Sequence, residues 1–338
     1  MKNRLNIIIA TLVGLGSIFT ACSQDDGIVV ANGDQKTPIS FNVGIGSIPD
    51  PQVSTRGYTT DFANNSGYTF EQNDVVSIAV THSGGSEVIK QYKVPSAIAT
   101  PQGLDYKCES DASSGTSFNW LSRSETLDLR AWSYGTADTP ATDPNGATFT
   151  LATTQTGSVK ELLYSPSDSY SFATNSGAIS FPLYHQLARV VVNITGSVSA
   201  DVTVNANGVT IGNSNLPTSA TFTKPASGNY GSWSAQAGTG SVTAKACTTD
   251  GSNRATYAAV IIPYDGTQAT PAFYGAGSKF IVIATSRGTY YYNIPAGGIN
   301  FQPGKQYTFN ITNLNQIDFN VTVSAWGAGA SETLNFSN

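Results

Sequence analysis

The chain has 338 residues, which is enough for about two domains of ordinary size, and 40% of its residues are hydrophobic. Only 12% are charged, whereas the sequence holds 33 Gly, 15 Pro and 10% aromatic residues, a composition typical of short β-strands joined by many turns. Two His and three Cys are too few for an ordinary zinc, haem or iron–sulfur site, and a formal net charge of −5 argues against nucleic-acid binding. We therefore expect neither a metal nor a cofactor.

The N-terminus has the pattern of a bacterial secretion signal. Lys2 and Arg4 precede an uncharged apolar run from Ile7 to Phe19, which is too short to span a bilayer as a mature anchor. The residues just before Cys22 resemble a lipobox, in which the Cys thiol accepts a diacylglycerol before cleavage. Residues 1–21 are thus expected to be a lipoprotein signal peptide, with an ordinary small-residue cleavage site as the alternative.

A short polar tether is expected after the signal peptide, at residues 22–36. Apolar and polar residues do not alternate in this stretch, and its Asp and Gly residues interrupt any regular element. Ser23-Gln24-Asp25-Asp26 resembles the surface-export signal of Bacteroidetes lipoproteins, and a merely solvated linker is the alternative. The expected location is therefore the outer membrane, with the lipoprotein exposed at the cell surface.

The remainder of the chain is predicted to be all-β. Ile39, Phe41, Val43 and Ile45 alternate with small or polar residues, which is the period of two of a half-buried strand. Strong amphipathic helices are absent from the sequence, and turns rich in Gly, Asn and Pro separate the runs, so the spacing favours β-sandwiches. Further strands are expected at residues 76–80, 127–131, 189–195, 202–209, 257–263, 280–285, 290–294, 307–311 and 319–326.

These strands are expected to form two domains. A stretch rich in Ser, Asn and Gly, residues 165–178, precedes a new apolar segment, and we place the boundary near Leu183. This gives an N-terminal β-sandwich domain at residues 37–183 and a C-terminal β-sandwich domain at residues 184–338.

No catalytic motif stands out in the sequence. His82 lies beside a Ser-Gly-Gly turn and His185 lies in an apolar segment, so we interpret both as structural residues. A glycosidase would need two carboxylates across a cleft, and the sequence does not place any pair in this way. The carboxylates considered are Glu125, Asp128, Asp138, Asp143 and Asp265. We therefore expect that the protein is not an enzyme.

Two cysteines remain once Cys22 is assigned to lipid. Cys108 and Cys247 fall in different predicted domains, and we expect two buried thiols. A bridge between them is the alternative, because the cell envelope permits disulfides.

Several segments in chain order carry a family resemblance. They are Ile39 to Val43 followed by Ser54-Thr55-Arg56-Gly57; Phe70 with Asn73 to Ile78; Asn119-Trp120 with Leu129 to Trp132; Glu161 to Tyr164; Phe181 to Val190; and Pro303 to Tyr307 with Ile317 to Trp326. Together they resemble the fimbrillin family of Bacteroidales, the pilin-like lipoproteins that build type V pili. Asn73 departs from the family pattern, which has Gly at this position of an F-x-x-G-D-x-I motif.

The resemblance implies two tandem transthyretin-like β-sandwich domains and a structural role as a pilin, a subunit of a surface fimbrium. In such pili a trypsin-like protease cuts after an Arg, which corresponds here to Arg56 and makes Gly57 the new N-terminus. The strand at residues 39–45 then departs, and the open sheet edge accepts a strand from another pilin subunit by β-augmentation. A plain loop arginine is the alternative for Arg56.

The C-terminus offers a candidate donor strand at residues 331–338, with Leu334 and Phe336 on one face. Eight residues extend to about 26 Å, which is short for a donor strand. Stalk, tip and anchor positions in the fimbrium therefore all stay open, as does the identity of a host or bacterial surface ligand.

A competing hypothesis is a monomeric surface lipoprotein that acts as an adhesin or a glycan-binding module. Exposed aromatic side chains would stack on sugars in that case, and the candidates are Tyr290, Tyr291, Tyr292, Trp120 and Trp132. Consecutive Tyr residues in a strand are also typical of one core residue with surface neighbours.

Overall fold

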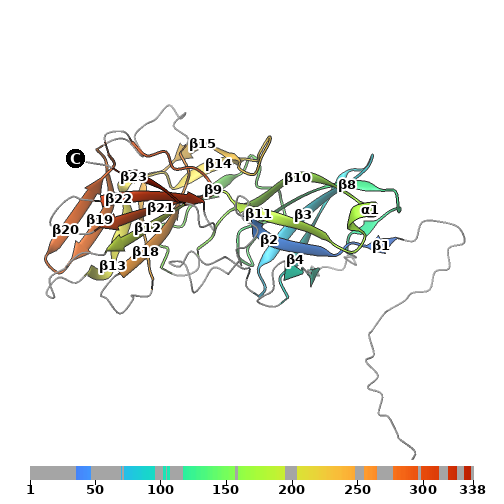
Figure 1. The fold of residues 1–338 in the computed structure, drawn as a ribbon, viewed down its shortest axis with the longest axis horizontal. Coiled ribbons are helices and arrows are strands. Elements are labelled where there is room, and N and C mark those ends of the chain that lie inside the picture. The colour runs from blue at the N-terminus through green and yellow to red at the C-terminus, as the bar shows by residue number, and fades with distance from the viewer. Residues whose placement is uncertain are drawn as a thin grey trace, which may run out of the picture. The chain divides into compact units, whose positions relative to one another are not determined.

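A computed structural model of the chain describes residues 36–46, 70, 72–95, 102–103, 105–106, 117–156, 159–194, 204–247, 255–264, 277–295, 298–311, 319–325 and 331–335. Nearly every regular element of this part is a β-strand (Figure 1). The exception is α1 (Phe172–Asn175), a single helical turn. None of the described residues belongs to a helix with the length and apolarity of a membrane span. The prediction of an all-β fold is confirmed.

The N-terminal half of the described chain builds an eight-stranded sheet. β2 and β11 run parallel, and the other neighbouring strands are antiparallel. β2 lies near one edge, with only the two-residue strand β5 outside it. In spatial order the strands are β5 (Gln102–Gly103), β2 (Phe41–Gly46), β11 (Ile179–His185), β10 (Leu163–Ser171), β8 (Thr126–Ser133), β3 (Val75–His82), β4 (Glu87–Lys93) and β6 (Asp105–Tyr106).

The C-terminal half contains a six-stranded and a four-stranded sheet. The six-stranded sheet has the order β17 (Lys245–Ala246), β18 (Ala255–Ile261), β12 (Ala188–Ile194), β21 (Lys305–Ile311), β22 (Phe319–Ala325) and β23 (Ser331–Asn335). The four-stranded sheet has the order β16 (Gly240–Thr243), β13 (Val204–Leu216), β19 (Lys279–Thr285) and β20 (Gly288–Asn293). β12 and β21 are parallel, which places strands from both ends of this half side by side.

Two smaller sheets complete the described strands. β1 (Thr37–Pro38) pairs with β7 (Asn119–Trp120), and the order β15 (Ser232–Ala237), β14 (Ser219–Thr223), β9 (Thr148–Thr150) forms a three-stranded sheet. β9 lies before the predicted boundary at Leu183, whereas its partner β14 lies after that boundary. β11 continues through Leu183, and β12 begins a new sheet at Ala188. The domains at residues 37–183 and 184–338, and their transthyretin-like topology, stay predictions.

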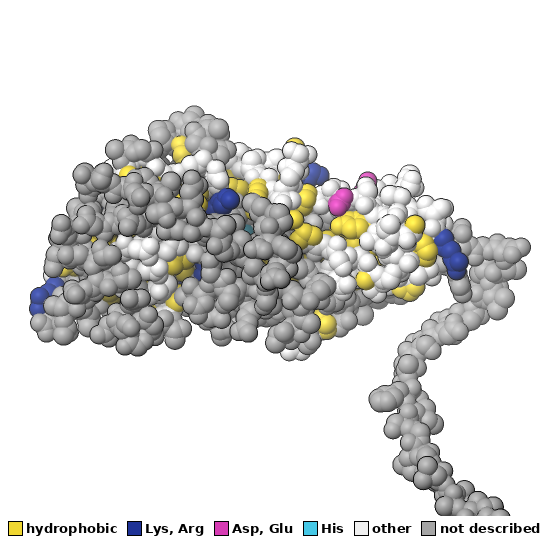
Figure 2. All heavy atoms as spheres, in the orientation of Figure 1, with side chains coloured by type: hydrophobic (Ala, Val, Ile, Leu, Met, Phe, Trp, Pro, Cys, Tyr) yellow, Lys and Arg dark blue, Asp and Glu magenta, His cyan; other side chains and the backbone are white. Residues whose placement is uncertain are grey.

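The alternating sequence pattern places apolar side chains inside the sheets, because successive strand residues point to opposite faces. β11 shows this clearly, since Ile179, Phe181 and Leu183 are buried and the residues between them are not. Among the described residues the large hydrophobic side chains that are exposed are Val88, Leu121 and Tyr291. On the face shown in Figure 2, the described hydrophobic side chains lie in groups separated by backbone and by other side chains. A candidate assembly site is therefore better sought under a covering strand than on this open surface.

Candidate functional site

The predicted released strand is β2, and it is embedded in the sheet. Phe41 and Val43 are buried, and Ile45 is partly buried against the same core. β2 runs parallel to β11 with Phe41 opposite Ile179 and Val43 opposite Phe181. The prediction that residues 39–45 form one alternating, half-buried strand is confirmed from Phe41 to Ile45, whereas Ile39 precedes the strand.

Phe41 is the centre of an aromatic cluster under β2. Its ring centroid lies 5.2 Å from that of Tyr92, 6.1 Å from that of Phe118 and 6.3 Å from that of Phe181, all in edge-on geometry. Such arrangements are favourable because the positive ring edge meets the negative ring face. Because Tyr92, Phe118 and Phe181 come from three other segments of the chain, removal of β2 would uncover a groove lined by aromatic side chains.

The residues just before β2 extend the covered region. Ile39 is buried, and its N–H donates to Phe118 O at 2.8 Å. In β1, Thr37 lies opposite Trp120, which is buried and packs edge-on against Phe172 at 5.8 Å. The Nε1 of Trp120 has no hydrogen-bond partner among the described residues. The whole stretch from Thr37 to Ile45 thus covers apolar side chains.

The outer side of β2 is only weakly covered. Its ladder with β5 has two pairs, Asn42 with Gly103 and Val43 with Gln102. Asn42 itself points away from the core and its Nδ2 donates to Ser180 Oγ at 3.3 Å. The strand is therefore held mainly by β11 and by its core-facing side chains.

The C-terminal candidate donor lies at the edge of a different sheet. β23 pairs antiparallel with β22 over five residues, with Leu334 opposite Val321. Its other side is the end of the six-stranded sheet. Phe336 lies outside the described residues, as do Cys22, Arg56 and Gly57. The roles of all of these residues stay predictions.

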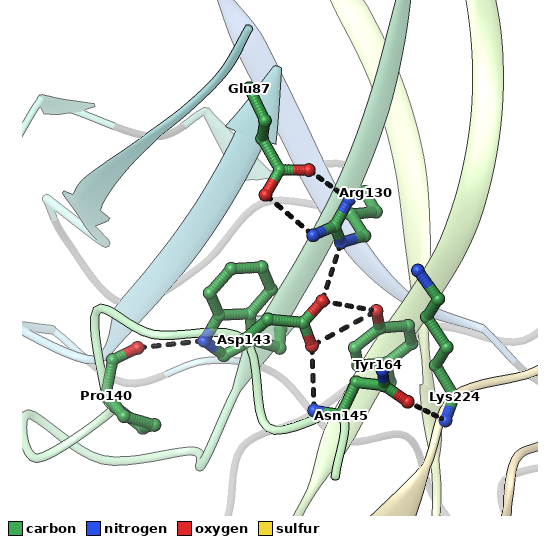
Figure 3. A network of polar contacts seen from close by, with 8 residues as sticks. Glu87, Arg130, Pro140, Asp143, Asn145, Tyr164 and Lys224 are labelled. Atoms are coloured by element: carbon green, nitrogen blue, oxygen red, sulfur yellow. Dashed lines mark hydrogen bonds and ion pairs between the residues drawn. The ribbon is translucent and has the colours of Figure 1, made fainter. Parts of the chain in front are cut away.

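Asp143, one of the carboxylates considered in the sequence, forms an ion pair with Arg130. The Nε of Arg130 donates to Asp143 Oδ2 at 2.8 Å, and its Nη2 donates to Glu87 Oε1 at 2.7 Å (Figure 3). Although burial alone would lower the pKa of Arg130, Asp143 and Glu87 raise it above its ordinary value. Burial, together with Asp143, raises the pKa of the Tyr164 hydroxyl, which donates to Asp143 at 3.4 Å. The network holds the loop that contains Asp143 against β8 and β10 of the eight-stranded sheet.

That loop is also tied to the C-terminal half. Asp143 Oδ1 accepts a hydrogen bond from Asn145 N at 2.9 Å, and Asn145 Oδ1 accepts one from Lys224 N at 2.9 Å (Figure 3). Trp132 Nε1 donates to Pro140 O at 2.8 Å. All of these contacts are structural, and none opposes two carboxylates across a cleft.

Both histidines lie against a glutamate. His82 Nδ1 is 2.6 Å from Glu125 Oε1, and His185 Nδ1 is hydrogen bonded to Glu161 Oε1. Glu161 and His185 are buried. Burial raises the pKa of the Glu161 carboxyl, and the charges of His185 and Arg189 oppose that rise. Sequence reasoning missed Glu161 as a partner, although an acidic residue directly before the apolar Leu162-Leu163-Tyr164 run was an available signal.

Most of the aromatic residues considered for sugar stacking are inside the fold. Trp120, Trp132 and Tyr292 are buried, and Tyr290 is partly buried. Tyr291 is 40% exposed, and Lys279 Nζ lies 3.8 Å from its ring centroid. The three tyrosines therefore consist of one core residue and its less buried neighbours, as expected for a strand.

The described residues contain no group of three or more His, Cys, Asp or Glu that could hold a metal ion. Cys247 is a half-buried free thiol, and burial raises its pKa. Cys108 lies outside the described residues, so the expectation of two buried thiols stays a prediction, and Cys247 is a free thiol that is only partly buried.

Comparisons with known proteins agree with this architecture. A family model described as fimbrillin-like matches residues 55–326. A solved structure of a candidate cell adhesion protein from Bacteroides uniformis ATCC 8492 is 15% identical, with a TM-score of 0.55, over 86% of this chain and 98% of the other. Another candidate cell adhesion protein, from Bacteroides ovatus ATCC 8483, is 14% identical, with a TM-score of 0.54, over 90% of this chain and 100% of the other.

At these identities the two structures indicate the fold alone. No curated protein matches the chain. The match to the family model covers most of the sequence, and it bears out the resemblance drawn from the motifs. This chain belongs to the fimbrillin-like family.

Proposed function

We propose that the protein is a pilin, a structural subunit of a surface fimbrium that assembles with other subunits by strand exchange. It is exported as a lipoprotein on Cys22, cut after Arg56 by an arginine-specific protease, and joined to the next subunit at the site that β2 occupies. The observation that carries this proposal is β2 itself. It precedes Arg56 in the chain, lies near a sheet edge, and covers the aromatic cluster around Phe41.

The burial of this segment sets the energy scale of the exchange. Ile39, Phe41 and Val43 are buried, and full burial of such a side chain is worth about 1.5–3 kcal/mol. Together they contribute about 5–9 kcal/mol, an upper figure because the released segment would keep some contacts of its own. Cleavage at Arg56 therefore leaves β2 in place until a strand of similar apolar content replaces it.

The incoming strand is proposed to be the C-terminal residues 331–338 of another subunit. β23 first has to leave the edge of its own sheet, where it pairs with β22. Leu334 and Phe336 are two residues apart, as are Phe41 and Val43, so they would reach the same face of the groove. The pairing with β22 would keep the donor strand covered in the unassembled subunit.

Cys22 is proposed to anchor the precursor in the outer membrane, and cleavage after Arg56 would separate the mature subunit from that anchor. Cys22→Ala should abolish incorporation of a palmitate analogue and leave an unprocessed precursor. Labelling of the variant at the level of the wild-type protein would refute the lipid assignment.

An arginine-specific protease tests the maturation site directly. The wild-type chain and an Arg123→Gln variant, which removes an exposed arginine elsewhere, should form an SDS-resistant ladder after digestion. Arg56→Gln should remain monomeric. A ladder from Arg56→Gln would rule out Arg56 as the site, and monomers in all three samples would favour the adhesin alternative.

Removal of residues 331–338 tests the donor. The shortened chain should still be cut after Arg56 and keep its circular dichroism spectrum, but it should form no ladder. Polymerisation equal to that of the intact chain would show that the C-terminal strand is not the joint.

A further inference from the structure

β11 is held in the eight-stranded sheet very unequally on its two sides. It lies between β2 and β10 (Figure 1). Its ladder with β2 has six pairs, from Ile179 to Tyr184, whereas its ladder with β10 has only two, Tyr184 with Tyr164 and His185 with Leu163. The stretch Ile179–Leu183 therefore has its ladder partners in β2, the strand that the proposed maturation removes.

Two prolines explain why the ladder with β10 stops. Continuing its register by two residues would bring Pro182 opposite Pro166. Neither proline has an N–H to donate, and proline in a sheet is confined to edges and irregular positions. β10 is irregular at this point, because its register with β8 shifts between Ser165 and Asp168. The prolines in the two strands therefore account for the short ladder between β10 and β11.

The other end of β11 is fixed by buried polar contacts. The imidazole of His185 bonds to the carboxylate of Glu161, and both side chains are buried. Gln186 N donates to Leu162 O at 2.8 Å, which continues the connection beyond the strand. The side chain of Gln186 is hydrogen bonded as well. Its Oε1 accepts from Gly231 N at 2.8 Å, and its Nε2 donates to Asn229 O at 3.0 Å.

We propose that β11 is a hinged strand whose Ile179–Leu183 part depends on β2, while Glu161, His185 and Gln186 fix its end. Loss of β2 then leaves the backbone of Ile179–Leu183 without its ladder partners. The fixed end keeps Ile179–Leu183 in register, so that an incoming strand can rebuild the ladder with β11 that β2 had formed. Glu161, His185 and Gln186 are in this sense positioning residues of the receiving site. The role in reception rests on the proposed function, whereas the hinge itself is a property of the single subunit.

Hydrogen exchange on the full-length, uncut and unassembled chain tests the hinge. Ile179 N donates to Ser40 O at 2.9 Å, and Gln186 N donates to Leu162 O, so these two amides report on the two ends of β11. Phe41→Ala loosens β2 and should reduce the protection of Ile179 and Phe181 by about a hundredfold or more, leaving Gln186 unchanged. Equal losses at both ends, or no change at Ile179, would overturn the proposal.

The positioning role is tested by Glu161→Gln against Glu125→Gln, which alters the other His–Glu contact of the chain, away from β11. In the Phe41→Ala background Glu161→Gln should lower protection at Gln186 at least about tenfold more than Glu125→Gln does, with β3 and β8 unaffected. Equal losses of protection at Gln186 in the two variants, or a loss of protection spread over all strands, would show that Glu161 only stabilises the core in general. If Glu161→Gln does not fold, the protection of Ile179 compared with that of Gln186 in the Phe41→Ala chain tests the hinge by itself.

The result is independent of assembly. A hinged β11 in a chain that never forms a ladder would leave this inference standing and refute the proposed function. A ladder-forming chain with a uniformly protected β11 would do the reverse.

Discussion

Replacing Phe41 with Ala should remove the main side-chain anchor of β2. The ring is about 1% exposed and contacts the rings of Tyr92, Phe118 and Phe181. Truncation of a buried Phe to Ala costs about 3–5 kcal/mol, because the transfer energy of the ring is lost and a cavity remains. We therefore expect the free energy of unfolding of the uncut chain to fall by about this amount.

Asn42→Ala is the matched control on the opposite face of the same strand. Its amide makes one exposed hydrogen bond to Ser180, so its removal should cost about 1 kcal/mol or less. Urea unfolding followed by circular dichroism measures both variants. After cleavage at Arg56, the N-terminal fragment should separate from Phe41→Ala during size exclusion but stay bound to Asn42→Ala. Equal losses of stability in the two variants would refute the view that core-facing side chains hold β2.

Three further outcomes are expected. Burial raises the pKa of Tyr307 to about 12, so the stability it contributes is present below pH 10 and is lost as the pH rises through 12. Its ionisation, followed at 295 nm against Tyr307→Phe, should be only about a tenth complete at pH 11. Asp143→Asn weakens the contact with Arg130 and should lower the free energy of unfolding by about 1–3 kcal/mol, whereas Arg123→Gln should change it by less than about 0.5 kcal/mol. Cys247 should react more slowly with iodoacetamide at pH 8 than after denaturation, because burial raises its pKa; equal rates by mass spectrometry would contradict its placement.

The local pattern in the sequence was enough to predict β2. Alternation from Ile39 to Ile45 correctly indicates that Ile39, Phe41 and Val43 are buried, because strand periodicity depends only on neighbouring residues. Asn73 likewise has a positive φ of 73° at the position where the family pattern has Gly, and Asn tolerates this conformation better than most residues.

Long-range pairing could not be read from the same pattern. Asn42 and Ser180 are 138 residues apart, and the local sequence pattern does not indicate that their strands run parallel. The partnership of Glu161 with His185 depends on a different long-range pairing, that of β10 with β11, which brings the two residues together. The burial of Trp120 and Trp132 depends on tertiary contacts, so sequence alone left both available for a binding surface.

The pairing of β9 with β14 has a consequence for the order of folding. Phe149 lies opposite Ala220, and its ring packs edge-on against Trp233 at 5.7 Å. A chain emerging from its N-terminus therefore exposes Phe149 until residues about seventy positions later have been made, because closing such a loop has to precede the contact. While Phe149 is exposed the chain is at risk of aggregation, and a chaperone would have its most useful target in the segment around β9.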